Sequence, residues 1–149
     1  MRIITSMVSR QVERVLFRFF THYSFLFPEN LSKDDFYKTL DQYIDVYIHG
    51  NLYLCHYNDT RHYDAIVRST TFFRHCRGMT INSEGKIVNL PFLRFLEYDY
   101  ADESMKINWQ NALAEEKHDG SLINVFYTNQ QWYIATRRRI DVIKDLQYI

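Results

Sequence analysis

The chain has 149 residues, the size of one ordinary domain or of part of a larger one, and its 46% apolar content argues against a chain that is disordered throughout. Its 18 Lys and Arg side chains are balanced by 18 Asp and Glu, so the formal net charge is zero. This balance argues against binding of nucleic acid by bulk charge alone, and any anion site must be a local arrangement of charges.

The first predicted element is an amphipathic helix from about Ser6 to Tyr23. An apolar stripe at helical spacing runs along it, formed by Val8, Val12, Val15 and Phe19. We expect this helix to dock on the rest of the protein. The alternative is a membrane-surface or presequence helix, because arginine outnumbers acidic residues there. No apolar run approaches the ~20 residues of a membrane span, so no membrane partner is expected.

The break at residues 28–32 is the predicted boundary between an N-terminal helical extension, residues 1–30, and a second unit, residues 31–149. Ser32, with Asp35 three residues later, resembles a capping box. A second helix is predicted from there to Gly50, because glycine often ends helices. The alternating residues 51–57 predict a strand.

The rest of the chain is predicted to be mainly β-structure, after an ambiguous stretch at 63–73 that we interpret as a short helix before a strand. The acidic residues 98–108 predict a surface loop, and a final helix is predicted to start at Ile140. The fold class is therefore α+β, with N-terminal helices packed on an antiparallel sheet that carries Lys117. Strands are predicted over 77–82, 86–90, 112–117, 121–128 and 132–138.

The two cysteines are too few for a disulfide framework and favour reduced thiols in a cytosolic protein. The chain lacks the C-x-x-C pairs of structural zinc sites, so no metal site is predicted. The alternative zinc site would recruit Cys55, His56, His62, His75 and Cys76.

The most informative string is Lys117-His118-Asp119-Gly120-Ser121, which lies between two predicted strands. A lysine becomes a nucleophile when it is desolvated or lies near other cations, because both favour the neutral amine. The glycine permits positive φ and lets a ligand approach the backbone. Asp119 is placed to orient the lysine or a bound cation, and His118 is given no role. The alternative is an exposed lysine followed by a common Asp-Gly hairpin turn.

This string resembles the first motif of the covalent nucleotidyltransferases, which are the DNA ligases, RNA ligases and mRNA capping enzymes. In that family the lysine of K-x-D-G forms a phosphoramide bond to a nucleoside monophosphate. Three further blocks are similar, in order and spacing, to RNA ligases of the tailed-phage tRNA-repair type. They are Arg77-Gly78-Met79 with the following strand, the segment 91–96, and the segment 135–139. The resemblance covers about residue 34 to the C-terminus.

The resemblance implies a role for each matching position. Lys117 matches the nucleophile that accepts AMP, and Arg77 matches an arginine beside the ATP phosphates. Arg94 stands where the family usually has a lysine, so a planar guanidinium replaces a compact ammonium. The implied nucleotide-binding residues are Arg77, Arg94, Glu116, Asp119, Gly120, Arg137 and Arg138. Each arginine also has a structural alternative: Arg77 and Arg94 paired with Glu84 or Glu97, and 137–139 as a solvated strand edge.

The resemblance implies an ATP-dependent RNA ligase that uses ATP and Mg²⁺, joins RNA ends such as those of a nicked tRNA, and works in the cytoplasm, or the host cytoplasm if viral. The family adds Glu-Gly and K-x-K blocks after this region, and the sequence contains neither in the corresponding place. We therefore expect a truncated adenylation domain. The alternatives are a non-catalytic nucleotide- or RNA-binding remnant, and one half of a split ligase completed by a second polypeptide.

Overall fold

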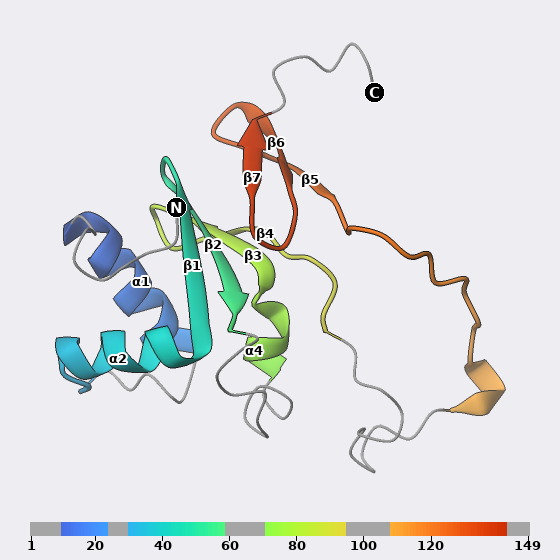
Figure 1. Cartoon of the computed structure of the whole chain (residues 1–149), viewed down its shortest axis with the longest axis horizontal. Coiled ribbons are helices and arrows are strands. Elements are labelled where there is room, and N and C mark those ends of the chain that lie inside the picture. Colours follow the sequence, from blue (N-terminus) through green and yellow to red (C-terminus); the bar gives the residue numbers. More distant parts are fainter. Residues whose placement is uncertain (1–9, 24–29, 59–70, 95–107, 143–149) are drawn as a thin grey trace.

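The computed structural model of the chain describes residues 10–23, 30–58, 71–94 and 108–142 (Figure 1). They form an α+β fold with antiparallel sheets, as the sequence predicts. The helices are α1 (Arg10–Tyr23), α2 (Lys33–Tyr43), α4 (Thr71–His75) and the short 3₁₀ turn η4 (Trp109–Asn111). The strands are β1 (Ile44–His49), β2 (Leu52–Tyr57), β3 (Arg77–Asn82), β4 (Ile87–Asn89), β5 (Asn124–Thr128), β6 (Gln131–Ala135) and β7 (Ile140–Val142).

The strands make two antiparallel sheets, a four-stranded sheet in the order β1-β2-β3-β4 and a three-stranded sheet in the order β5-β6-β7. Helices α1 and α2 cover one face of the larger sheet, and the smaller sheet packs on its other side (Figure 1). Every residue of β2 is buried, because this central strand has neighbours on both faces. Tyr53 and Cys55 belong to the helix-side core, and Leu52 and Leu54 to the core beneath the smaller sheet.

Helix α1 is docked on the core, as predicted. Val12, Leu16, Phe19 and Phe20 are buried, while the arginines at positions 10, 14 and 18 are exposed. Phe19 and Phe20 meet Phe72, at the start of α4, at ring-centroid distances of 6.1 and 5.8 Å. The first turn of the predicted helix, residues 6–9, lies outside the described residues. No helix in the described part of the chain is both long enough and apolar enough to cross a membrane.

Helix α2 begins with the predicted cap at Ser32. The Asp35 N–H donates to Ser32 Oγ at 3.2 Å, and Ser32 Oγ donates to Asp35 Oδ2 at 2.6 Å. The predicted end at Gly50 is wrong, because the helix stops at Tyr43 and the next six residues form β1. This segment, IDVYIH, alternates buried and less buried side chains, and pairing with β2 overrides its apparent helical spacing. Gly50, at φ 57°, lies in the β1–β2 turn.

Two other predicted elements also differ from the structure. Ile140 starts the strand β7, paired with β6, instead of a helix. Residues 112–117 form no strand, and among the described strands none pairs with them, so Lys117 lies outside both sheets. The predicted strands at 77–82 and 132–138 correspond to β3 and most of β6. The predicted loop at 98–108, except for its last residue, and most of the ambiguous 63–73 segment lie outside the described residues.

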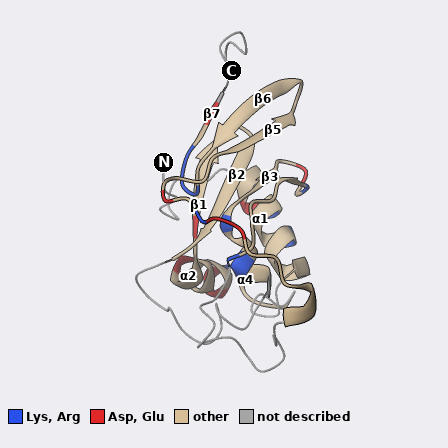
Figure 2. Cartoon of the chain, turned by 90° about the vertical axis from the view of Figure 1, so that its right-hand side faces the viewer, with Lys and Arg blue, Asp and Glu red and all other residues tan. Residues whose placement is uncertain are grey.

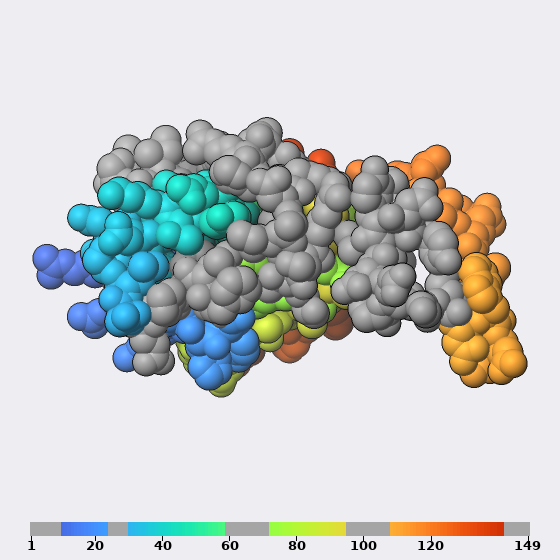
Figure 3. Space-filling view, turned by 90° about the horizontal axis from the view of Figure 1, so that it is seen from below, coloured from blue at the N-terminus to red at the C-terminus, as the bar shows by residue number. Residues whose placement is uncertain are grey.

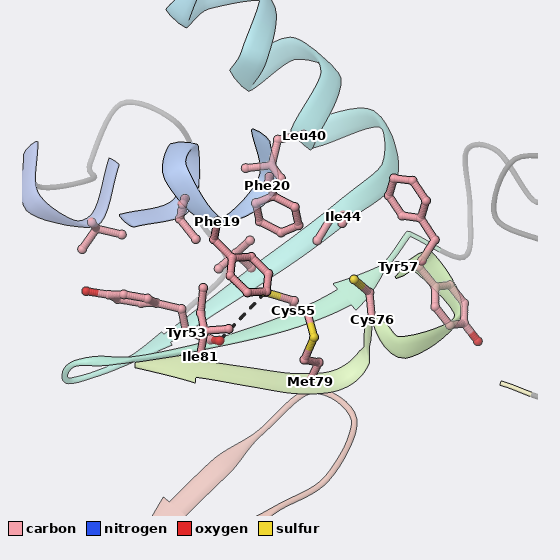
Figure 4. Packing of buried hydrophobic residues seen from close by; sticks show 14 of the residues in the cluster. Phe19, Phe20, Leu40, Ile44, Tyr53, Cys55, Tyr57, Cys76, Met79 and Ile81 are labelled. Atoms are coloured by element: carbon pink, nitrogen blue, oxygen red, sulfur yellow. Dashed lines mark hydrogen bonds between the residues drawn. The ribbon is translucent and has the colours of Figure 1, made fainter. Parts of the chain in front are cut away.

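The two cysteines are buried on the helix side of the four-stranded sheet (Figure 4). Burial raises the pKa of the Cys55 thiol from 9.0 to about 12. Burial also raises the pKa of Cys76 well above 9.0, and the neighbouring Cys55 contributes to the same shift. Both side chains are therefore neutral, apolar parts of the core near neutral pH. Among the described residues, no group of three His, Cys, Asp or Glu is placed to hold a metal.

We predict that the fold loses stability at alkaline pH because of these thiols. An unfolded cysteine ionises near 9.0, whereas folded Cys55 keeps its proton to about 12. The contribution is fully present below pH 9, and the free energy of unfolding then falls as pH rises, because the unfolded chain binds fewer protons. Urea unfolding across this window measures the slope. We expect a shallower slope for Cys55→Ala, and an unchanged slope would contradict this assignment.

Candidate functional site

The candidate site is built around a close contact between β3 and the turn after β6. Gly78 has φ +100°, and a Cβ at this position would lie 3.0 Å from Arg137 Cα and 3.3 Å from the Thr136 carbonyl oxygen. Both neighbours are backbone atoms, so they cannot rotate away as a side chain would. Only glycine therefore lets the two segments approach this closely. The turn is closed by the Thr136 N–H, which donates to the Arg139 carbonyl at 2.9 Å.

This contact forms one wall of a pocket of about 540 Å³ between the two sheets and the chain before β5. The pocket gathers residues that are far apart in the sequence and that belong to three predicted blocks. Gly120 comes from the K-x-D-G string, Arg77 from the start of β3, and Arg137 and Arg138 from the basic turn. Figure 2 shows this basic turn as a blue stretch of chain next to β7.

The pocket is electropositive. Three arginines line it, and no Asp or Glu is among its described lining residues. The alternative pairing of Arg77 with Glu84 is not seen, since Glu84 binds Lys86 at 2.9 Å. The third arginine of the turn, Arg139, does not line the pocket, and its Nε bonds Asp141 Oδ2 at 2.7 Å. A pocket lined by three arginines and, among its described residues, by no acid is suited to a compact anion such as a phosphate chain, even in a chain of zero net charge.

The predicted nucleophile is near this pocket in sequence but does not line it. The Lys117 side chain is 70% exposed, and its Nζ lies 3.3 Å from Asp119 Oδ1. Glu116 is exposed as well, with one carboxylate oxygen 3.8 Å from His118 Nδ1. Figures 1 and 3 show this segment leaving the two sheets and lying at the end of the molecule opposite α1 and α2. Of the K-x-D-G string, the described pocket lining thus contains Gly120 and not Lys117 or Asp119.

Arg94 is also placed away from the pocket lining. Its guanidinium lies over the Tyr57 ring, with Cζ 5.0 Å from the ring centroid. Its backbone N–H donates to the Arg74 carbonyl at 3.1 Å, and Arg74 Nε donates to the Arg94 carbonyl at 2.8 Å. These contacts hold Arg94 between α4 and the end of β2. The structure thus does not bring Arg94 to the pocket that Arg77, Arg137 and Arg138 line.

The sequence prediction gave no role to Asn124, a polar residue of the pocket. Asn124, the first residue of β5, lines it together with Ser121. The signal was available in the alternation of the strand NVFYT, where Asn124 falls on the same face as Phe126, which is buried in the core. A polar side chain on the inward face of a strand indicates a polar partner or a ligand.

A second cavity, of about 470 Å³, lies between α1 and α2. Arg10, Arg14 and Lys33 line it, but so does Glu13, whose carboxylate is already bonded to Lys33. It contains none of the predicted site residues. The pocket at Gly78 is therefore the better candidate for a functional site.

We predict that Gly78→Ala damages both the fold and the pocket. Gly50→Ala is the control, because Gly50 also has positive φ but nothing within 4 Å of the added Cβ. Both variants bear the cost of an unfavourable φ, about 1–2 kcal/mol. Gly78→Ala should cost at least about 1 kcal/mol more in the free energy of unfolding, because its Cβ meets backbone. If urea unfolding gives the same loss of unfolding free energy for both variants, the backbone contact at Gly78 does not contribute to stability.

We also predict that neighbouring arginines of one turn differ in their effect on ATP binding. Arg137→Ala should weaken binding about tenfold or more, because a hydrogen bond to a charged group contributes about 1.5–3 kcal/mol. Arg139→Ala is the matched control, since its guanidinium is bonded to Asp141 and does not line the pocket. Isothermal titration with ATP measures both affinities. Similar losses in the two variants would point to general charge attraction and against a defined pocket.

Comparisons with protein-family models, with curated proteins and with solved structures found no match to this chain. The function of the pocket therefore has to be inferred from the residues that form it.

Proposed function

We propose that the chain is the N-terminal part of the adenylation domain of an ATP-dependent RNA ligase, with Lys117 as the residue that accepts AMP. One observation carries the proposal: Arg77, Gly120, Arg137 and Arg138, which come from three of the family-like blocks, line one electropositive pocket. Convergence of separate blocks on one site is a stronger argument than any single string, because a chance K-x-D-G match would not bring the other blocks to it.

The first reaction would transfer AMP to the chain. The neutral Lys117 amine attacks the α-phosphorus of ATP, a nitrogen–phosphorus bond forms, and the bond to the β-phosphate oxygen breaks, so pyrophosphate leaves. The arginines of the pocket would bind the triphosphate and stabilise the negative charge that develops on the leaving group. The proton lost by the ammonium before attack passes to solvent. The product is a lysyl-AMP phosphoramide.

Two further steps would join RNA ends. The 5′-phosphate of one RNA end attacks the AMP phosphorus, the bond to Lys117 breaks, and the RNA end carries an activating AMP. The 3′-hydroxyl of the other end then attacks the terminal RNA phosphorus, a phosphodiester forms, and AMP leaves. The pocket would therefore bind phosphate groups of two substrates in turn, first the triphosphate of ATP and then the 5′-phosphate of the RNA end.

The proposal requires Lys117 to change its surroundings. Attack on phosphorus needs a neutral, directed amine, whereas Lys117 is exposed and bonded to Asp119. Gly120, which lines the pocket, is three residues away and has φ 139°, a conformation open mainly to glycine. Rotation about this glycine would carry Lys117 toward the arginines without changing either sheet.

Mg²⁺ would reach this site as part of the Mg·ATP substrate. No group of three His, Cys, Asp or Glu among the described residues is placed to hold a metal. Mg²⁺ commonly keeps several waters and binds through substrate phosphates. When bound, it would neutralise part of the charge on the phosphates.

One alternative is a split ligase, of which this chain is one half and a second polypeptide completes the active site. A second candidate function is nucleotide binding without catalysis, as a remnant. The exposure of Lys117 favours this candidate, since the described pocket holds the phosphate-binding arginines without the nucleophile. The catalytic and the non-catalytic candidates use the same pocket, and they differ in whether Lys117 reacts with ATP.

We predict that incubation with Mg·ATP adds the mass of one AMP to the protein. Lys117→Ala should abolish the adduct in an intact-mass measurement. Lys86→Ala is the control for nonspecific reaction, because its side chain is similarly exposed, at 75% against 70%, and is also paired with an acid two residues away. An adduct that persists in Lys117→Ala would contradict the assigned nucleophile.

Two other outcomes separate the remaining candidates. ATP binding without an adduct supports the non-catalytic function, and an adduct that forms only after a second polypeptide is added supports a split enzyme. Absence of both ATP binding and adduct, in a protein that is folded by circular dichroism, would contradict the proposed function as a whole.

A further inference from the structure

The cavity between α1 and α2 has both charged and apolar walls. Arg10 and Arg14 line it from α1, and the apolar part of its lining consists of Phe17, Leu31 and the Tyr37 ring. Residues four apart lie on the same side of a helix, so the two arginine side chains leave α1 side by side. The volume of about 470 Å³ lies within the range of pockets that bind small molecules. Walls of this kind are suited to a ligand with a charged end and an apolar body.

The two arginines are available to a ligand. Both are exposed, and within the described part of the chain no acidic side chain pairs with either of them. Glu13, the one acid among the described lining residues, is bonded to Lys33 of α2. The described lining therefore carries three cations and one acid. A guanidinium offers a planar fork of N–H donors that fits the two oxygens of a carboxylate.

The Tyr37 wall of the cavity is neutral and carries a polar atom that the described protein leaves unsatisfied. Burial, followed by the nearby Glu13 carboxylate, raises the pKa of Tyr37 above its usual value of 10.0. The phenol therefore keeps its proton at every pH at which a carboxylic acid is ionised and the protein is folded. Its hydroxyl is buried and has no hydrogen-bond partner among the described residues. A buried polar atom in this state indicates a water or a ligand that completes the site.

We propose that this cavity binds a small monocarboxylate, with its carboxylate held by Arg10 and Arg14 and its apolar body packed on Phe17 and Leu31. The charged hydrogen bonds fix one end of the ligand, and burial of the apolar body against the wall removes apolar surface from water. The cavity shares no residue with the pocket at Gly78 among the described lining residues of the two. The inference therefore does not rest on the proposed ligase function.

Charge favours a single carboxylate over a nucleotide at this place. An adjoining recess of about 370 Å³ shares Glu13, Lys33 and Tyr37 with the cavity and adds two further acids and one lysine. The described lining of the recess thus has three acids, Glu13, Asp34 and Asp41, against two lysines. A triphosphate or a nucleic-acid backbone would extend from the arginines toward these acids and be repelled. A ligand with one negative charge and an apolar body avoids this repulsion.

Titration of the full ¹⁵N-labelled chain with octanoate, followed through backbone amide chemical shifts, tests the proposal and does not depend on ligase activity. We expect saturable changes at the amides of residues 10–17 and 31–37, and none at Gly78. Octanol keeps the apolar body without the charge, and acetate keeps the charge without the apolar body. Each should bind about tenfold or more weakly than octanoate, because each lacks one of the two kinds of contact.

Two arginine variants of the same helix make the test specific. Arg14→Gln should raise the dissociation constant for octanoate about tenfold or more, because a charged hydrogen bond is lost while the helix keeps a polar side chain. Arg18→Gln is the matched control, because Arg18 is also exposed but is not among the described residues that line the cavity. It should bind octanoate as the wild type does.

Three results would overturn the proposal. The first is the absence of saturable octanoate shifts in α1 and α2 of the folded wild type. The second is an equal loss of octanoate affinity in Arg14→Gln and Arg18→Gln, which would indicate general charge attraction by the helix. The third is binding of octanol, or of inorganic phosphate, at the same amides as tightly as octanoate, since the cavity would then recognise only one end of the proposed ligand.

Discussion

The close backbone contact at Gly78 is the constraint on which the proposed site depends. The absence of a Cβ lets β3 of the larger sheet touch the turn that follows β6 of the smaller sheet. Arg77 is the neighbour of Gly78, and Arg137 is the residue touched, so one contact places two cations on one pocket. A phosphate chain is recognised best by donors whose positions are fixed before it binds, because little ordering cost then remains.

The four-stranded sheet provides the rigidity that this contact requires. Its central strand β2 is buried throughout, between helices on one face and the smaller sheet on the other. Arg77 is thus anchored to β3, which packs in the helix-side core, and the basic turn is anchored to β6 and β7, which pack in the core on the other face. Lys117 is attached differently, in a segment that pairs with no described strand. The structure therefore separates an electropositive pocket from an exposed candidate nucleophile, and Gly120 joins the two.

Local signals in the sequence predicted a large part of this fold, and long-range pairing explains the rest. The Ser32 cap and the apolar stripe of α1 act within one helix, so spacing alone revealed them. The C-terminal end of α2 and the strand at residues 140–142 depend on partners distant in sequence, namely the pairing of β1 with β2 and of β7 with β6. Likewise, the arginines at 77 and 137 were identified by resemblance to a family, but Asn124 and the role of Gly78 required the three-dimensional contact.

The central claim is that the segments meeting at Gly78 form a phosphate-binding pocket in the free chain. Titration of ¹⁵N-labelled protein with ATP, followed through backbone amide chemical shifts, tests it most directly. The account predicts that the amide chemical shifts of Gly78, Gly120 and residues 136–138 all change with the same dissociation constant for ATP. The amide chemical shifts of α1 and α2 should not change. Shifts confined to the helices around Lys33, or the absence of any shift at Gly78 and Arg137, would contradict it.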